Sequence, residues 1–175
     1  MSPVVAAART MSAHGLSVKV PAGWDGSIRR AAGDPSDTDI DDVGRLGTTN
    51  PVLHVASFPL PAVRGDYGGG AVQAMGPNDV FIALVEFDPD AGSTPLFSAP
   101  GLRRPLRVTD FDRSTMHRPL PGASGHQQFF HTRGRAFALY VALGAHRLRA
   151  SSVPRVDRVL ATLSINAKPA DIPNE

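Results

Sequence analysis

The feature that most constrains the fold is the stretch 125–144, in which two β-rich runs, HQQFFHT and RAFALYVALG, flank Gly134. A glycine between two such runs predicts an antiparallel hairpin, because a tight turn there needs a left-handed backbone conformation that glycine adopts without strain. In any register of this loop, Phe129 or Phe130 lies across from Phe137, a pairing that contributes up to about 1 kcal/mol. The sequence therefore predicts an antiparallel sheet.

The segment after this hairpin changes from strand-like alternation to the spacing of a helix. An apolar stripe runs over 153–163, and Arg155 and Arg158 fall on the opposite side. Ser152 and Pro154 are typical start signals, so we predict a helix there. Such a short helix is unstable alone, so we expect it to pack on one face of the hairpin. The stripe consists of Val153, Val156, Val159, Leu160 and Leu163, and the hairpin face of Phe137, Leu139, Val141 and Leu143.

Shorter apolar runs predict the remaining strands. Residues 16–20 alternate apolar and polar side chains, and a turn separates them from a run over 24–30, so we expect an opening hairpin. Residues 79–88 (DVFIALVEFD) are apolar on both faces, which predicts a central strand covered on both sides. We further expect a strand over 51–58 and weak edge strands over 105–108 and 111–116.

The composition agrees with a β-rich chain. Among 175 residues, 17 Gly and 16 Pro break regular structure too often for a helical bundle. Cysteine is absent, which excludes disulfides, thiolate metal sites and a cysteine nucleophile. We predict an α+β fold in which an antiparallel β-sheet carries a C-terminal helix on one face. The expected organisation is a flexible N-terminal arm (1–13), a single α+β domain (14–166) and a polar tail (167–175).

Both ends of the chain resemble a known family. The opening GLSVKVPAGW resembles the start of PsbP-like domains, and the pair GRAFALYVALG and PRVDRVLATLSI is similar to their late central strand and C-terminal helix. These parts cover about a third of the chain and are structural motifs. The resemblance implies a PsbP-like α/β sandwich and a non-catalytic interaction or assembly role. The chain is also similar to small proteins of high-GC Gram-positive bacteria, and its 16 Arg to 2 Lys fit such a bacterial genome.

The charge pattern bears on partners and location. The formal net charge is +2, and no block of five or more Lys or Arg residues occurs, so we expect no nucleic-acid partner. The N-terminus lacks the basic start and the apolar core of a secretory signal, and no run reaches the roughly 18 apolar residues of a membrane span. We expect a cytoplasmic protein without a membrane span.

Two titratable side chains stand out because they interrupt apolar strands. His54 lies in the middle of one strand, and Glu86, one of two glutamates, interrupts another. A buried carboxylate must find a partner or take up a proton, and such groups sometimes mark binding sites. The structural alternative is that Glu86 lies near a strand end and pairs with an arginine, while His54 bonds a neighbour. Both are candidate binding residues.

Two arginines flank the predicted hairpin turn. Arg133 and Arg135 lie on either side of Gly134. Two guanidinium groups on an exposed turn can grip an anionic partner bidentately. The alternative is that they are solubilising charges. We include both among the candidate binding residues.

Three patterns that suggest chemistry fail on their spacing. The acidic run 37–42 lacks the glycine and the bidentate acid that an EF-hand needs at its sixth and twelfth positions. Residues 122–126 (GASGH) end in histidine where a nucleophile elbow needs glycine, and they precede a strand. Asp110 and Asp112 would share a strand face that excludes His117. We expect no catalytic residue, metal or cofactor.

The sequence favours a non-enzymatic interaction or accessory (assembly) domain. Its expected partner is another protein or a second copy of the chain. The alternative is a small-molecule-binding protein or minor enzyme with a cleft near His54 and Glu86. The two hypotheses differ in whether those side chains converge on one pocket.

Overall fold

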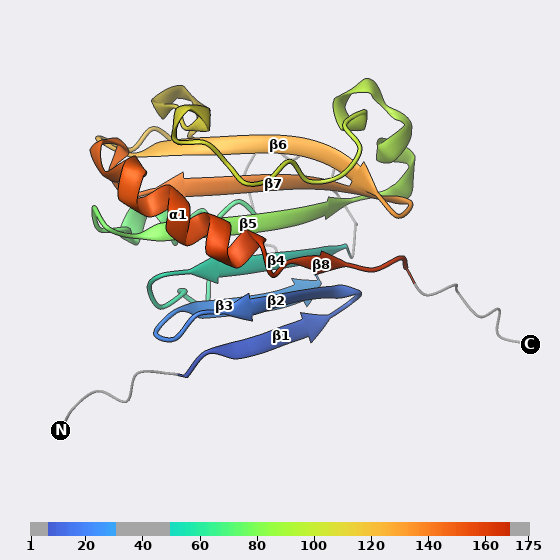
Figure 1. The fold of residues 1–175 in the computed structure, drawn as a ribbon, viewed down its shortest axis with the longest axis horizontal. Helices are drawn as coiled ribbons and strands as arrows, with labels where there is room; N and C mark the ends of the chain where they lie inside the picture. Colours follow the sequence, from blue (N-terminus) through green and yellow to red (C-terminus); the bar gives the residue numbers. More distant parts are fainter. Residues whose placement is uncertain (1–6, 31–49, 169–175) are drawn as a thin grey trace, which may run out of the picture.

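The computed structural model describes residues 7–30 and 50–168. This part of the chain contains two antiparallel sheets and one α-helix near its C-terminal end, so the expected α+β fold is confirmed (Figure 1). The strands are β1 (Arg9–Ala13), β2 (Leu16–Val20), β3 (Asp25–Arg30), β4 (Pro51–Ala56), β5 (Val80–Phe87), β6 (Ser124–Thr132), β7 (Arg135–Leu143) and β8 (Ser164–Ile165), and the helix is α1 (Arg149–Leu160). Short 3-10 turns are η1 (Val72–Ala74), η2 (Pro89–Ser93), η3 (Pro95–Phe97), η4 (Val108–Asp110), η5 (Arg113–Thr115) and η6 (His146–Leu148).

The larger sheet has the strand order β3-β4-β5-β7-β6, and every neighbouring pair is antiparallel. β5 lies at its centre between β4 and β7, and all of its residues except Phe87 are buried. A strand with apolar side chains on both faces is stable only where both faces are covered. The prediction of a covered central strand is confirmed.

β6 and β7 form the predicted hairpin through the two-residue turn Arg133-Gly134. The φ angles of these residues are 50° and 73°, and two positive values are what a two-residue turn of this hand requires. Phe130 pairs with Phe137 across the strands, with ring centroids 5.6 Å apart. The expected hairpin, its left-handed glycine and its phenylalanine pair are confirmed.

A smaller sheet, with the order β1-β2-β8, joins the two ends of the described chain. β1 lies within the segment expected to be a flexible arm, and a turn at His14 and Gly15, with φ of 52° and 74°, connects it to β2. The expected hairpin between β2 and β3 is wrong, because β2 pairs with β1 and β8 whereas β3 pairs with β4. The alternation in RTMSA is too weak to identify β1 from sequence, so β2 was left without its true partner.

The C-terminal helix is present but begins at Arg149, four residues before the predicted start. The turn η6 leads directly into it and no side chain caps its first turn, so Ser152 and Pro154 lie inside the helix. The edge strands expected over 105–108 and 111–116 are wrong. Those residues form loops and the turns η4 and η5, and among the described residues the isolated bridge between Asp112 and Gly125 is their one β-bridge to β6.

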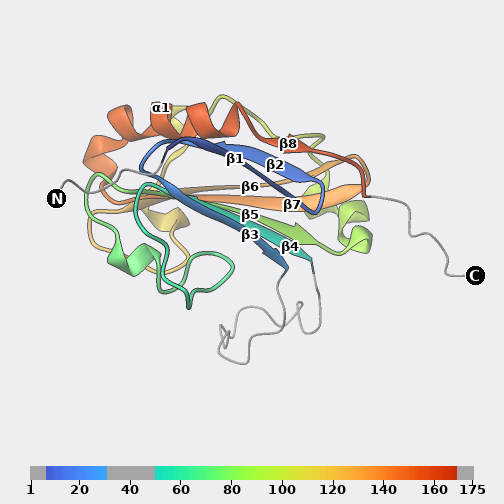
Figure 2. The same cartoon turned by 90° about the horizontal axis from the view of Figure 1, so that it is seen from below.

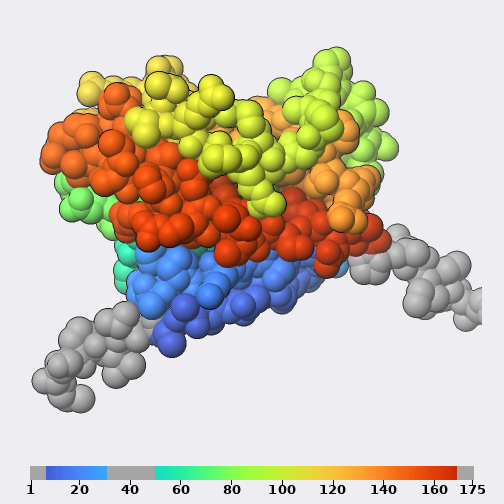
Figure 3. All heavy atoms as spheres, viewed as in Figure 1, coloured from blue at the N-terminus to red at the C-terminus, as the bar shows by residue number. Residues whose placement is uncertain are grey.

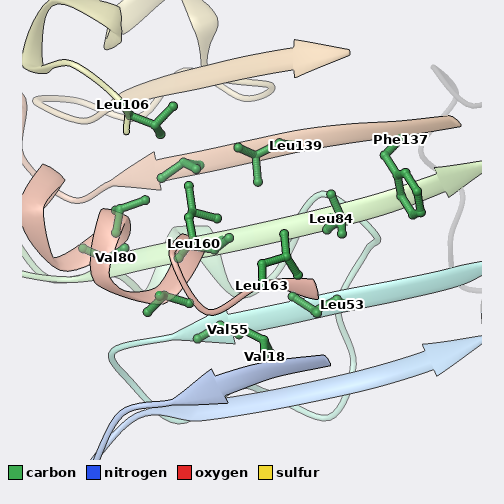
Figure 4. Packing of buried hydrophobic residues seen from close by; sticks show 14 of the residues in the cluster. Val18, Leu53, Val55, Val80, Leu84, Leu106, Phe137, Leu139, Leu160 and Leu163 are labelled. Carbon is green, nitrogen blue, oxygen red and sulfur yellow. The ribbon is translucent and has the colours of Figure 1, made fainter. Parts of the chain in front are cut away.

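α1 and the smaller sheet together cover one face of the larger sheet (Figure 1). Figure 4 shows Leu160 and Leu163 pointing from the helical side toward Leu84 and Leu53 of the sheet. The four hairpin residues expected beneath the helix belong to the same aliphatic cluster and are fully buried; they are Phe137, Leu139, Val141 and Leu143. The predicted packing of the helix on the hairpin is confirmed.

The segment before η4 closes over α1 from the other side. The Leu106 amide donates to Asp157 Oδ1 at 2.8 Å, and Arg104 donates to the carbonyls of Leu160 and Leu163. In Figure 3 the red helical segment accordingly lies between this yellow-green segment and the blue strands β1 and β2. The Arg104 bonds satisfy carbonyls at and just beyond the C-terminal end of the helix.

The opposite face of the larger sheet is covered by two loop segments, 57–76 and 116–123 (Figure 2). Their shared core combines Phe81 and Tyr140 with five buried alanines, Ala56, Ala71, Ala83, Ala123 and Ala142. Alanines bury little apolar surface each. This layer therefore depends more on directional polar contacts than the helical layer does.

Two segments named in the sequence analysis are not part of the described structure. The acidic run 37–42 and residues 169–175 of the polar tail lie outside the described residues. Across 7–30 and 50–168, no helix combines the length and apolar character needed to cross a bilayer.

Candidate functional site

Polar side chains alternate along β3, an edge strand of the larger sheet. Asp25, Ser27 and Arg29 are two residues apart and therefore point to the same face. This is the face covered by the loop 57–76, and in register with Ser27 lies His54 of β4. An otherwise apolar face thus carries a group of polar side chains at the edge of the sheet.

Each of the three β3 side chains makes a hydrogen bond to the loop that crosses them. Asp25 Oδ2 accepts from the Leu60 amide at 2.9 Å. Ser27 Oγ accepts from Arg64 Nη2. Arg29 Nη2 donates to the Arg64 carbonyl oxygen at 2.8 Å. The loop is therefore fixed to β3 at several points along its length.

Arg64 also reaches from the loop to the buried imidazole of His54. Its Nε donates to His54 Nδ1 at 2.8 Å, and its Nη1 donates to the Pro61 carbonyl at 2.6 Å. His54 Nε2 lies 2.7 Å from the Asp66 carbonyl oxygen. Because Nδ1 accepts a hydrogen bond, Nε2 carries the proton and donates it. The ring is therefore neutral and in its Nε2–H tautomer.

The protonation of His54 follows from these surroundings. Burial, together with the positive charges of Arg64 and Arg29, lowers its pKa from 6.5 to about 3, against the opposing effect of the hydrogen bond to the Asp66 carbonyl. The side chain is 0% exposed and both ring nitrogens are occupied. His54 therefore acts as a structural link between strand and loop, and the alternative in which it bonds its neighbours is confirmed.

The charges that lower the pKa of His54 are those of Arg64 and Arg29, and two carboxylates lie near these arginines. Burial and the charge of Arg29 lower the pKa of Arg64, while Asp25 raises it. Arg29 Nη2 lies 3.7 Å from Asp66 Oδ1. We call this group the polar seam; it consists of Asp25, Ser27, Arg29, His54, Arg64 and Asp66.

The polar seam supports an exposed apolar side chain. Val63 directly precedes Arg64 and is 70% exposed. Pro61, two residues earlier, supplies the carbonyl that Arg64 Nη1 bonds. The side chain of Arg29 is 31% exposed beside this loop. The result is a fixed loop whose exposed valine is followed in the chain by Arg64, the residue whose carbonyl Arg29 bonds.

A second polar cluster joins β5 and β7 on the opposite face of the larger sheet. Arg135 donates from Nε to Glu86 Oε1 at 3.0 Å and from Nη2 to Glu86 Oε2 at 2.7 Å, a bidentate pair. Both side chains are 1% exposed. Arg135 also donates to the carbonyls of His14 and Asn166, and Lys168 Nζ lies 3.5 Å from Glu86 Oε1. This ion pair fastens the β1–β2 turn and the segment after β8 to the larger sheet.

The sequence-predicted binding residues do not form one site. His54 pairs in register with Ala83, and Glu86 lies three positions further along the same strand, so the two side chains point to opposite faces. The expected cleft shared by His54 and Glu86 is therefore wrong. The alternative in which Glu86 pairs with an arginine near a strand end is confirmed by its bonds to Arg135.

The expected pair of exposed arginines is also wrong. Arg133 is exposed in the hairpin turn, whereas Arg135 is buried and bonded to Glu86. Strand alternation turns Arg135 toward the face that carries Phe137, where its guanidinium lies 5.1 Å from the ring centroid. The two arginines cannot grip one anion together.

The remaining sequence motifs lie apart from the polar seam. Ser124 is buried at the start of β6, and its Oγ has no hydrogen-bond partner among the described residues. Asp110 Oδ2 bonds Arg103 at 2.9 Å, and His117 stacks on Tyr67 with ring centroids 4.4 Å apart. In the described part of the chain, no three His, Asp or Glu side chains group as metal ligands.

Of the polar seam, only His54 was predicted from the sequence as a candidate residue. A local signal for the β3 side chains exists, because Asp25, Ser27 and Arg29 alternate with Gly26 and Ile28. No local signal exists for the others, since Arg64 and Asp66 lie in a loop whose path over β4 is set by tertiary contacts.

Comparisons of the chain with protein-family models, with curated proteins and with solved structures found no match.

Proposed function

We propose that this protein is a non-enzymatic interaction or accessory domain that contacts a protein partner through the loop around Val63. The observation that supports this proposal is that the polar seam holds an exposed loop in place. Its hydrogen bonds fix the loop to β3 and β4, and the loop carries a valine that is 70% exposed. The resemblance of both chain ends to PsbP-like domains points to the same kind of role.

A loop that is already ordered is suited to binding. Ordering loop residues at an interface costs free energy, so a loop held by several hydrogen bonds in the free protein binds with a smaller cost. Arginines are enriched among the residues that dominate interface energetics, and the partly exposed Arg29 bonds the carbonyl of Arg64, the residue after the exposed valine. The loop thus combines an apolar contact with adjacent charged groups.

The buried titratable groups support a structural rather than a catalytic role. A general base needs a free nitrogen or oxygen within reach of its substrate and a pKa near the working pH. His54 has both nitrogens bonded and a pKa of about 3, and both carboxylate oxygens of Glu86 accept bonds from Arg135. These side chains stabilise the fold that presents the loop.

Site-specific photocrosslinking tests the proposal. Benzoylphenylalanine replaces Val63 in one variant and Leu96 in another, in cells of the source organism. Leu96 is the matched control because it is also a large exposed side chain, 56% exposed, and lies in η3. We expect a discrete protein adduct from position 63 that is absent from position 96.

The adduct must also depend on the loop. Val63→Asp, introduced with the crosslinker at position 62, is expected to reduce the adduct at least tenfold, whereas Leu96→Asp leaves it unchanged. A chain that elutes as a monomer and gives no adduct from position 63 contradicts the proposal. An adduct formed equally well from positions 63 and 96 contradicts it too.

A further inference from the structure

The charge balance of the polar seam points to the chemistry of the partner. Asp66 Oδ1 lies at the long distance of 3.7 Å from Arg29 Nη2. Asp25 accepts hydrogen bonds from the amides of Leu60 and Gly26. Arg64 donates to an imidazole nitrogen, a carbonyl and a hydroxyl, all of which are neutral acceptors. The guanidinium charge of Arg64 is therefore bonded without a direct carboxylate contact among the described residues.

Arg29 retains unused hydrogen-bonding capacity beside it. Within the described residues its guanidinium makes one hydrogen bond, from Nη2 to the Arg64 carbonyl, and its buried Nε has no acceptor. A buried donor without an acceptor is costly, and a guanidinium bonds best to a carboxylate in a two-point geometry. Since the side chain as a whole is 31% exposed, an incoming anion can reach the guanidinium at its exposed part rather than at the buried Nε.

We infer that the loop recognises an acidic segment of a partner protein, with a carboxylate bound by Arg29 next to Arg64 and an adjacent apolar side chain packed on Val63. This inference rests on the proposed function and names the partner's chemistry. The two halves of the contact are neighbours, because the Arg64 carbonyl bonded by Arg29 belongs to the residue after Val63.

The same geometry favours a protein carboxylate over a nucleic acid. A nucleic acid is held by many cations placed along its backbone. Here two guanidinium groups lie beside the carboxylates of Asp25 and Asp66, and the exposed neighbour is an aliphatic valine. One carboxylate with one apolar side chain matches that surface in charge and size.

A titration with blocked dipeptides tests this recognition on the full chain. The probes are N-acetyl-Leu-Glu-amide, N-acetyl-Leu-Gln-amide and N-acetyl-Gly-Glu-amide, and the readouts are the Arg29 Nε–H and Val63 backbone N–H signals in ¹H–¹⁵N spectra. We expect the Leu-Glu probe to shift both signals. Removing either the charge or the leucine should weaken binding about tenfold, the usual loss for one charge-assisted bond or one buried aliphatic group.

Matched variants separate recognition from folding. Arg29→Gln should weaken binding of the Leu-Glu probe about tenfold and leave the preference for leucine over glycine unchanged. Val63→Ser should abolish that preference. Arg158→Gln, on the exposed side of α1, is the control arginine and should bind all probes as the unchanged chain does. Dispersed spectra of each variant show that it is folded.

The outcomes distinguish this inference from the proposed function. Equal binding of the Leu-Glu and Leu-Gln probes overturns the acidic-partner inference. It is also overturned if a twelve-residue oligothymidylate shifts the same signals and binds more tightly than the Leu-Glu probe. If position 63 still captures a protein in either case, the interaction role stands and only the partner chemistry is wrong. If the dipeptides bind as expected but position 63 captures nothing, the interaction role fails and the carboxylate specificity stands.

Discussion

The two layers that flank the larger sheet are held in different ways. On one face, α1 and the smaller sheet bury a large aliphatic cluster, and the Glu86–Arg135 pair closes one end of it. On the other face, a loop lies over a smaller cluster rich in alanine and is fixed by the bonds of the polar seam. The first layer depends on apolar area and the second on directional contacts.

This difference separates stability from presentation. Aliphatic burial stabilises a fold in proportion to area and tolerates small shifts, whereas hydrogen bonds require defined positions. The helical layer can therefore provide most of the free energy of unfolding. The loop layer can be less stable and still hold Val63 in one place, which is what a contact loop requires.

The largest expected effect is the loss of the buried ion pair. Glu86→Gln leaves the Arg135 charge buried without its carboxylate, so the free energy of unfolding should fall by about 3–5 kcal/mol in urea melts. The double variant Glu86→Leu/Arg135→Met removes both charges and should lose less. Arg133→Gln, two residues away and exposed, is the control and should change stability by less than about 0.5 kcal/mol. A single variant as mild as this control would show that the pair does not fasten the two sheets.

The aliphatic cluster gives the next largest effect. Leu160→Ala should lower the free energy of unfolding by about 2–5 kcal/mol, because it removes a fully buried side chain and leaves a cavity. Arg158→Ala lies on the exposed side of the same helix and should stay within about 0.5 kcal/mol. Urea melts of the two variants measure the contrast, and equal effects would mean that α1 contributes little to the core.

The sequence was informative where structure is set by local pattern. The 124–143 hairpin and the stripe of α1 follow from alternation, glycine and helical spacing within short windows. β1 could not be identified in this way, because RTMSA has little apolar alternation and its place depends on the turn to β2. β3 ends at residue 30 and its partner β4 begins at residue 51. Local spacing says nothing about partners that are so distant in the sequence.

The candidate site was harder to predict for the same reason. His54 and Glu86 were identifiable because a polar residue within an apolar strand is unusual. Their separation onto opposite faces depends on the register of β4 against β5, which no single strand reveals. The partners Arg64 and Arg135 come from a loop and from another strand, so their roles required the tertiary structure.

Acid should weaken the loop layer through His54. Its pKa is about 3 in the folded protein and about 6.5 in the unfolded chain, so between these values the unfolded chain binds the extra proton. The free energy of unfolding therefore falls as the pH drops from 6.5 toward 3, by up to about 1.4 kcal/mol per pH unit. His54→Gln should flatten the slope of urea-melt stability against pH in this window. Burial also lowers the pKa of His126, so the part of the slope that His126 contributes should remain in this variant.

The smallest expected effect separates charge from geometry within the polar seam. Arg64→Lys keeps the positive charge but loses the planar group that bonds Ser27, His54 and the Pro61 carbonyl. We expect local opening of the loop to become easier by about 1 kcal/mol, so that the Leu60 and Gly65 amides exchange with deuterium several times faster.

Amides in the centre of β5 should exchange at an unchanged rate, because that strand is held by β4 and β7 rather than by the loop. Arg158→Lys serves as the matched substitution on the helical layer and should alter neither set of amides. If Arg64→Lys instead accelerates exchange throughout β5, the polar seam belongs to the global stability of the fold. If the Leu60 and Gly65 amides do not respond at all, the positive charge alone holds the loop and the contact surface around Val63 is not fixed by the arginine geometry.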